Sequence, residues 1–311
     1  MGLPVVIVRG ILESGKTTFI EESLKYKDFG DLGRTLIISQ EQGEIEYNKE
    51  ELKKCKADVV YLDSIDEWND KHINDLIREY KPQAVFIEVN EMWEFDTLPM
   101  PMYFDVQQVM TIIDGTTFNA YFANMRQRFV DMIRSSEIVI INRCQPIPET
   151  SQMKRNVKMV NQNVAVLALN DKGEELKLES DLPYSLKEDV IKIELDDFGP
   201  FYIDTFENKD RYENRVVEFD CMAVFDRKLP PKSFVAGRLA MTCCVDDIQL
   251  MGHLCTYKES IQLENKSWIH LKAVIHYLNF RGAKEKQLIF ELLEYKKIDT
   301  PSEDKALVML R

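Results

Sequence analysis

The chain has 311 residues, of which 45% are hydrophobic, and a formal net charge of -13 at pH 7. This length and apolar content suit about two globular domains, whereas the negative charge argues against broad binding to nucleic acid or anionic membranes, which require a positive surface. No apolar run approaches the roughly 20 residues that span a bilayer and no basic-then-apolar signal peptide begins the chain, so we expect a cytoplasmic protein without membrane insertion.

The first predicted elements are a strand and a helix joined by a glycine-containing loop. The β-branched run at residues 5–8 leads to Gly10, four residues intervene, and Gly15-Lys16-Thr17 opens a helix, which is the G-x-x-x-x-G-K-T pattern in its strand-to-helix context. The glycines let backbone amides surround a phosphate, the lysine reaches the β- and γ-phosphates, and the threonine hydroxyl ligates Mg²⁺. The alternative, a turn that binds nothing, needs neither the lysine nor the hydroxyl. The predicted nucleotide contacts here are Gly10, Glu13, Ser14, Gly15, Lys16, Thr17 and Thr18.

Short apolar runs alternate with amphipathic segments through the first half of the chain. Strands are predicted at residues 35–39, 59–62, 84–88, 109–114, 137–142 and 164–169, and helices lie between them, including one at 118–134 and one at 150–160. This alternation predicts an α/β fold of the P-loop NTPase type, with a parallel sheet and helices on both faces. Since ligands of such sheets bind at the carboxyl ends of the strands, we expect Gly10, Glu41 and Glu88 to converge there.

The pattern changes near residue 172. Residues 173–189 are rich in Asp, Lys and Glu, as linkers are. Short strands separated by turn residues then follow at 190–195, 215–225, 233–243, 249–255, 268–277 and 287–293. We therefore predict a P-loop domain at 1–172, a linker at 173–189 and a smaller, mostly-β domain at 190–311, either an OB-like barrel, which we favour, or a sandwich.

Four motifs follow the phosphate loop in a specific order. They are a Glu-Gln-Gly-Glu segment at 41–44 where a family has N-E-x-G-E, Ile-Glu at 87–88 where it has I-E-T-S-G, a strand ending in Asp at 111–114 where it has V-V-D, and Asn-Arg-Cys-Gln at 142–145 where it has N-K-x-D. With these motifs, residues 4–168 resemble the CobW/HypB/UreG group of metallochaperone GTPases.

The resemblance implies binding of a purine nucleoside triphosphate, GTP with ATP not excluded, and weak Mg²⁺-dependent hydrolysis achieved by positioning and charge neutralisation. The resemblance also implies catalytic roles for Lys16, Glu41 and Glu88, and binding of Mg²⁺ by Thr17 and Glu88. Asn142 and Arg143 would meet the base.

Four positions depart from the family pattern. Gln145 replaces the aspartate that reads guanine, and a neutral amide cannot accept the paired N–H bonds of guanine as a carboxylate does, so discrimination against adenine should fall. Arg143 replaces the lysine of the same motif and keeps its charge. Asn90-Glu91 replaces the Ser-Gly after the Walker B glutamate, so we expect hydrolysis to be slow or absent. Residues 60–68, where the CobW branch has a C-x-C-C metal-transit site, contain no cysteine.

The second half resembles a different family. Residues 201–298, and above all the Arg-x-x-x-Thr-Cys-Cys-x-x-Asp pattern at 238–247, are similar to the C-terminal domain of the YcgQ-like proteins that accompany a bacterial putative permease. The fusion implies a membrane permease or a metalloprotein client as a partner of the nucleotide-binding domain, and oligomer formation stays open. The competing hypothesis to a weak GTPase is a non-hydrolysing nucleotide switch or interaction module that regulates such a permease.

The six cysteines lack C-x-x-C spacing, so we expect thiols rather than a disulfide framework. A Zn²⁺ or other transition-metal site is predicted if Cys243, Cys244, His253 and Cys255 converge. His253 and Cys255 share one face of a strand, while adjacent cysteines point to opposite faces. The alternative is that these thiols are small core residues.

Overall fold

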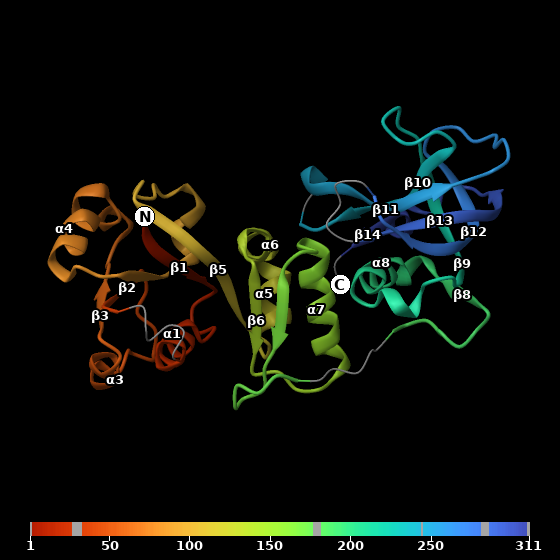
Figure 1. The fold of residues 1–311 in the computed structure, drawn as a ribbon. Helices are drawn as coiled ribbons and strands as arrows, with labels where there is room; N and C mark the ends of the chain where they lie inside the picture. Colours follow the sequence, from red (N-terminus) through yellow and green to blue (C-terminus); the bar gives the residue numbers. More distant parts are fainter. Residues whose placement is uncertain (1, 27–32, 177–181, 244, 281–285, 310–311) are drawn as a thin grey trace. The chain divides into compact units, whose positions relative to one another are not determined.

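Two units make up the chain in a computed structural model, which describes residues 2–26, 33–176, 182–243, 245–280 and 286–309 (Figure 1). The N-terminal unit comprises Met1–Leu178 and the C-terminal unit Glu179–Arg311. Each unit has its own sheet. Within the described residues, no helix combines the length and apolar content that crossing a membrane requires.

The N-terminal unit is built on a seven-stranded sheet in which all neighbouring strands run parallel. In spatial order the strands are β3 (Ala57–Tyr61), β2 (Thr35–Ser39), β4 (Ala84–Glu88), β1 (Leu3–Arg9), β5 (Phe104–Asp114), β6 (Ile138–Asn142) and β7 (Ala165–Ala168). The predicted α/β fold of the P-loop NTPase type is confirmed.

Helices cover both faces of this sheet. Val5 and Ile7 of β1 pack in one apolar cluster with Ile73 of α4, whereas Val6 of β1 packs in the opposite cluster with Ile20 of α1. The alternation arises because successive strand side chains point to opposite faces. The helices of the unit are α1 (Lys16–Lys25), α3 (Lys49–Lys54), α4 (Asp70–Tyr80), α5 (Phe118–Asn124), α6 (Arg126–Ser135) and α7 (Pro148–Val160).

Asn69 caps α4, since its side-chain oxygen accepts a hydrogen bond from the backbone N–H of His72. The single helix predicted at 118–134 is wrong, because the backbone of Met125 leaves the helical region (φ -129°) and separates α5 from α6.

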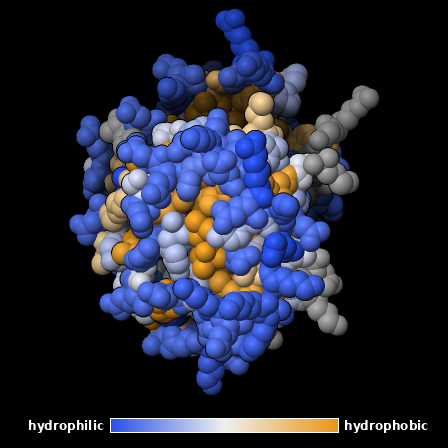
Figure 2. Space-filling model, turned by 90° about the vertical axis from the view of Figure 1, so that its left-hand side faces the viewer, coloured by the Kyte–Doolittle hydropathy of each residue, from blue (hydrophilic) through white to orange (hydrophobic). Residues whose placement is uncertain are grey.

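Seen from the side of α4 and β3, the surface is mainly hydrophilic, with a narrow strip of apolar residues near its centre (Figure 2). On this side β3 forms the edge of the sheet, and its residues 58–61 are only partly buried.

The register of the sheet brings polar residues together at one edge. Val8 of β1 and Ser39 of β2 both pair with Glu88 of β4, and Asp114 of β5 pairs with Asn142 of β6. All five strands run in the same direction, so their carboxyl ends lie at the same edge of the sheet. The phosphate loop, which follows β1, therefore starts beside Glu88.

The C-terminal unit contains a closed five-stranded barrel. β9 (Val216–Val224), β10 (Ser233–Met241), β11 (Ile248–Thr256), β13 (Gln287–Lys297) and β12 (Ser267–Leu278) pair in this order, and β12 pairs back to β9. Of the two alternatives predicted, the barrel is confirmed and the sandwich is wrong. β8 (Val190–Ile193) extends the sheet beside β9, and β14 (Leu307–Met309) extends it beside β10.

A helix that the strand pattern did not reveal packs in this unit. α8 (Phe198–Glu207) presents Phe198 and Phe201 to Phe219 of β9, with ring centroids 5.7 and 5.8 Å apart. Its apolar content resembles that of a buried strand, so periodicity alone could not separate the two.

A histidine on the outside of the barrel links two strands. His270 of β12 lies with Nδ1 2.6 Å from the Asp220 carboxylate and Nε2 2.9 Å from that of Glu218, both on β9. Partial burial opposes protonation, but the two carboxylates prevail and raise the pKa of His270 above its usual value. The ion pair therefore stabilises the folded state fully below about pH 6.5, and this stabilisation is lost as the pH rises through the higher folded-state pKa.

We expect His270→Gln to lower the thermal unfolding midpoint of the barrel by about 1–3 °C at pH 6, the size typical of a partly exposed ion pair, and by less at pH 8. Differential scanning calorimetry of the full chain at both pH values measures the two differences. A difference of equal size at both pH values would contradict this assignment.

Candidate functional site

The phosphate loop connects β1 to α1 and depends on two glycines. Gly10 has φ 149° and Gly15 has φ 98°, backbone angles that residues with a side chain rarely adopt. A Cβ atom on Gly10 would lie 2.4 Å from the carbonyl oxygen of Ile112, and one on Gly15 would lie 2.6 Å from Nδ2 of Asn142. Both positions therefore require glycine for packing as well as for backbone conformation.

Lys16 lies inside the loop and is 2% exposed. Its Nζ donates hydrogen bonds to the carbonyl oxygens of Gly10 (2.7 Å) and Ile11 (3.1 Å), and it forms an ion pair with Glu41. Burial raises the pKa of Glu41 above its usual value, and the charge of Lys16 opposes this shift. The predicted residues Lys16 and Glu41 are thus in direct contact.

Glu88, at the end of β4, accepts hydrogen bonds from three hydroxyl groups and is 2% exposed. The Thr17 hydroxyl donates to Oε1 (2.8 Å), while Ser39 and Tyr47 donate to Oε2 (2.7 and 2.9 Å). Burial and the neighbouring Glu88 charge raise the pKa of Tyr47 well above its usual value, so Tyr47 stays a hydrogen-bond donor. One carboxylate oxygen is thereby fixed, and the other faces the phosphate loop.

Asn142 and Arg143 meet the loop from β6. The Asn142 Nδ2 donates to the carbonyl oxygen of Ser14 (2.7 Å), and its Oδ1 is buried without a hydrogen-bond partner. Arg143, with φ 52°, donates to the carbonyl oxygen of Glu13 (3.1 Å) and forms an ion pair with Asp114. The predicted base contacts therefore lie against the phosphate loop, and Asn142 has an acceptor available.

The pocket enclosed by these groups is small. Its lining includes Gly15, Lys16, Thr17, Glu41 and Glu88, and its volume is about 30 Å³. This volume holds only one or two water molecules, far less than a triphosphate. In this pocket the ammonium group of Lys16, which a phosphate would contact, is paired with Glu41.

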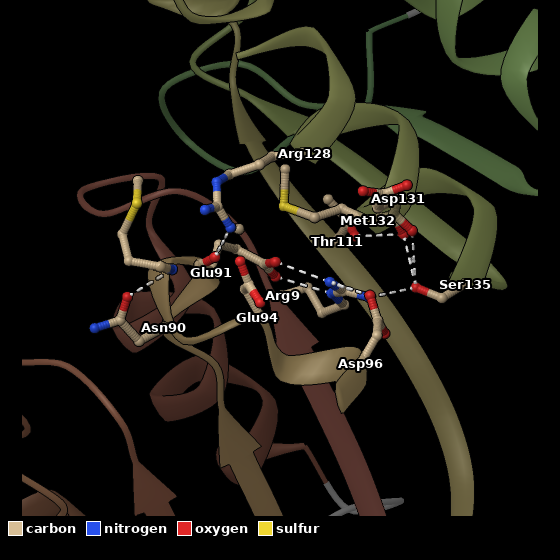
Figure 3. A network of polar contacts seen from close by, with 12 residues as sticks. Arg9, Asn90, Glu91, Glu94, Asp96, Thr111, Arg128, Asp131, Met132 and Ser135 are labelled. Atoms are coloured by element: carbon tan, nitrogen blue, oxygen red, sulfur yellow. Dashed lines mark hydrogen bonds and ion pairs between the residues drawn. The ribbon is translucent and has the colours of Figure 1, made fainter. Parts of the chain in front are cut away.

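The segment after the Walker B glutamate is held by a buried ion pair. Arg9, at the end of β1, donates from Nε and Nη2 to the two carboxylate oxygens of Glu91 (2.8 Å each), and these residues are 3% and 5% exposed. Nη1 of Arg9 also donates to Asp96 (2.9 Å) and to the Ser135 hydroxyl (2.7 Å), and Arg128 donates to the carbonyl oxygen of Glu91 (Figure 3). We call this set, Arg9, Glu91, Asp96, Arg128 and Ser135, the Arg9 network.

The Arg9 network has a structural consequence. Glu91 stands where the family pattern has the glycine that follows the Walker B glutamate, and it is tied to β1 and to α6. The buried guanidinium and carboxylate are satisfied bidentately, which is the most directional form of this pairing. Movement of this segment therefore requires breaking a buried ion pair.

Some functional residues escaped sequence reasoning. Ser39 and Tyr47 hold Glu88, but a serine that ends a strand and a tyrosine in a polar stretch carry no motif. Arg9 could have been identified from the sequence, since it is a charged residue at the end of an apolar strand, immediately before the first glycine of the phosphate loop.

The predicted soft-metal ligands lie in different parts of the barrel unit. His253 pairs with Ala236 on β10, five residues from Met241, which is about 17 Å along the strand from the end that leads to Cys243. The His253 ring packs against the rings of Tyr202 and Phe206, with centroids 4.8 and 5.1 Å away, and its Nε2 contacts the Thr205 hydroxyl (3.2 Å).

Burial lowers the pKa of His253 to about 3 and raises that of Cys255 far above its usual value. Cys243 contacts Asp247, and Cys244 is outside the described residues. No group of three or more His, Cys, Asp or Glu residues suited to a metal ion occurs in the part of the chain that the structure describes. The structure thus does not bring Cys243 together with His253 and Cys255.

Comparisons with known proteins cover both units. Two family models match: CobW/HypB/UreG, nucleotide-binding domain, over residues 4–168, and DUF1980 C-terminal domain, over residues 168–305. No protein with a curated description matches the sequence.

Solved structures are similar over the first of these regions at low sequence identity. HypB, a hydrogenase maturation factor from Archaeoglobus fulgidus, has 15% identity and a TM-score of 0.41, with 56% of this chain and 84% of that chain covered. The Zn(II)-bound YjiA GTPase from E. coli has 12% identity and a TM-score of 0.42, with 57% and 61% covered. HypB from Helicobacter pylori in complex with nickel has 15% identity and a TM-score of 0.39, with 55% and 80% covered.

Proposed function

Because the chain belongs to the CobW/HypB/UreG family through residues 4–168, we propose that its N-terminal unit binds a purine nucleoside triphosphate, principally GTP, together with Mg²⁺. The observation that supports this proposal most is that Lys16, Thr17 and Glu88 line one pocket at the phosphate loop. The pocket therefore offers the buried ammonium group of Lys16 to a phosphate, and the oxygen atoms of Thr17 and Glu88 to a metal ion. Calorimetric titration with GTP, GDP and ATP tests the proposal, and it fails if none of them binds.

The donor set fits magnesium. The Thr17 hydroxyl and Glu88 Oε1 lie 2.8 Å apart, and both are the hard oxygen ligands that Mg²⁺ takes. We assign Thr17 and Glu88 to this ion, with Ser39 and Tyr47 orienting the carboxylate. The ion supplies charge neutralisation to the phosphates. Lys16 leaves Glu41 to contact the phosphates, and Glu41 is then free to orient water near the terminal phosphate.

We propose that the base lies near Asn142 and Arg143 and is read with low selectivity. The unpartnered Oδ1 of Asn142 gives one acceptor, but Gln145 is exposed and carries no charge. Without a carboxylate, the paired N–H donors of guanine have only neutral acceptors. GTP and ATP should therefore bind with affinities within about tenfold of each other.

Gln145→Asp should raise the preference for GTP over ATP about tenfold, because it restores a charged acceptor for guanine. Parallel titrations of the variant with GTP and ATP measure the ratio. Gln162→Asp, which adds the same charge on an exposed loop, is the matched control and should leave the ratio unchanged. If both variants shift the ratio of GTP to ATP affinity equally, the proposal that residue 145 contacts the base is refuted.

For turnover we propose weak Mg²⁺-dependent hydrolysis, with a non-hydrolysing nucleotide switch as the second candidate. The Arg9 network favours the second candidate, because it holds Glu91 where the family has a mobile glycine. Single-turnover assays with GTP and ATP separate the two. Phosphate release above buffer supports the hydrolase, and its absence leaves the switch.

The C-terminal unit, which matches the DUF1980 C-terminal domain, is our candidate for contact with a partner, either a membrane permease or a metalloprotein client. A role in metal homeostasis would need Cys243 and Cys244 to bind Zn²⁺ or another transition metal. Equimolar Zn²⁺ retained after desalting, and lost in Cys243→Ser/Cys244→Ser, would support this role. An unmetallated wild-type chain would remove it.

A further inference from the structure

A second pocket lies on the other side of the phosphate loop from the base contacts. Its volume is about 460 Å³, within the range of pockets that bind organic ligands. Its walls come from the loop, from the ends of β2 and β3, and from the segment after β4. Its lining includes Ile11, Leu12, Gln40, Leu62, Asn90 and Met92. We call this site the Gln40 pocket.

One side-chain group in this pocket lacks a partner. Gln40 is 1% exposed, and its Oε1 accepts a hydrogen bond from the backbone N–H of Asn90 (3.2 Å). That contact fixes the amide orientation, because only the oxygen can accept from an N–H. Nε2 is therefore left with its donors unused, and it has no hydrogen-bond partner among the residues that the structure describes. Buried donors without partners are rare, since they cost stability.

The charges around the pocket indicate which acceptor suits Gln40. Among the described residues that line it, none is basic. Two of its acidic residues are engaged elsewhere, Glu41 with Lys16 and Glu91 with Arg9. Asp63 is exposed and adds negative charge. An anionic ligand would be repelled, so the acceptor should be a neutral carbonyl oxygen.

Apolar surface continues from the pocket onto its rim. Ile11 and Leu62 are 8% and 3% exposed and form inner walls, whereas Leu12 and Met92 are 49% and 55% exposed at the rim. Large apolar side chains left in solvent beside a concave site are typical of surfaces that bind proteins. The ligand should therefore extend beyond the pocket, as a polypeptide does.

The wall formed after β4 is held in place before any ligand binds. The Asn90 side chain accepts a hydrogen bond from the backbone N–H of Met92 (3.0 Å), and the Arg9 network fixes Glu91 between them (Figure 3). A fixed wall reduces the ordering cost of binding.

We propose that the Gln40 pocket binds an apolar side chain of a polypeptide partner, with Gln40 Nε2 donating a hydrogen bond to the neighbouring main-chain carbonyl. Ile11 and Leu12 belong to the phosphate loop, but Gln40, Leu62 and Met92 do not line the phosphate pocket. The inference therefore does not require the phosphate loop to bind nucleotide.

The test uses the full chain and N-acetyl-leucine methylamide, a probe with an apolar side chain between two neutral carbonyls. The expected dissociation constant is about 1 mM, typical of an uncharged ligand of this size, measured by saturation-transfer NMR. N-acetyl-leucine, which differs in its free carboxylate, should bind at least fivefold more weakly. Absence of methylamide binding, or equal binding of the acid, overturns the proposal.

Variants locate the site. Gln40→Met keeps the length of the side chain and removes the donor, so the probe should bind about tenfold more weakly. The matched control Gln42→Met, an exposed amide on the same pocket, should change binding less than twofold. Unchanged binding by Gln40→Met, or an equal loss in Gln42→Met, overturns the proposal. If Gln40→Met fails to fold, Met92→Glu at the exposed rim replaces it, with at least threefold weakening expected and an unchanged affinity overturning the proposal.

Discussion

Lys16→Ala should weaken GTP binding about 100-fold or more, because it removes the buried cation that the phosphates would contact. A hydrogen bond to a charged group contributes about 1.5–3 kcal/mol, and Lys16 can form more than one with a triphosphate. Isothermal titration calorimetry of the wild-type chain and the variant, both with Mg²⁺, measures the loss. The competing ion pair with Glu41 makes the expected loss smaller than the gross contact energy.

The matched control is Lys25→Ala, at the other end of α1, where the lysine is 39% exposed and pairs with Glu22. This variant should bind GTP as the wild-type chain does. Because Lys16→Ala also leaves the buried carboxylate of Glu41 unpaired, thermal unfolding must show that the variant is folded. An unchanged affinity in a folded Lys16→Ala chain would reject the assignment of the phosphate site.

The features predicted from the sequence are those that local patterns determine. Apolar runs of five residues between helices identified β2 and β4 at their observed bounds, and the spacing from Gly10 to Thr17 identified the loop. A parallel sheet places strand ends at one edge, so the approach of Glu88 to the phosphate loop followed from topology, whereas the pairing of Thr17 with Glu88 followed from the family resemblance.

The features that escaped prediction depend on contacts between distant residues. Tyr47 reaches Glu88 across 41 positions, and Arg9 reaches Glu91 across 82. In the barrel, His253 and Cys255 share a face as expected, but the interior that they share is filled by aromatic rings of α8. No spacing rule predicts that rings of α8 pack against His253, so a metal site inferred from spacing could not take α8 into account.

Arg9→Met should lower the free energy of unfolding of the N-terminal unit by about 3–5 kcal/mol, because it leaves the Glu91 carboxylate buried and unpaired. The loss corresponds to a fall of roughly 10 °C in the unfolding midpoint. Burial opposes the charge of Arg9, but Glu91 and Asp96 prevail and raise the pKa of Arg9, so the guanidinium stays charged. Denaturant unfolding of the full chain, followed by circular dichroism, measures the difference.

Arg78→Met is the matched control, since Arg78 is 80% exposed and its ion pair with Asp75 spans 3.6 Å, so its loss should cost less than about 0.5 kcal/mol. Arg9→Met/Glu91→Leu should recover most of the stability, because apolar residues of similar volume can replace a buried ion pair. If the double variant is as unstable as Arg9→Met, the buried charge is not the cause.

The same double variant connects stability to turnover. It removes the ion pair that holds residue 91 to β1 while leaving Lys16, Thr17 and Glu88 in place. If the Arg9 network is what limits movement after Glu88, single-turnover phosphate release should be faster in the double variant than in the wild-type chain, with GTP affinity unchanged. Equal rates would mean that the lack of a glycine at position 91, and not the ion pair between Arg9 and Glu91, limits hydrolysis.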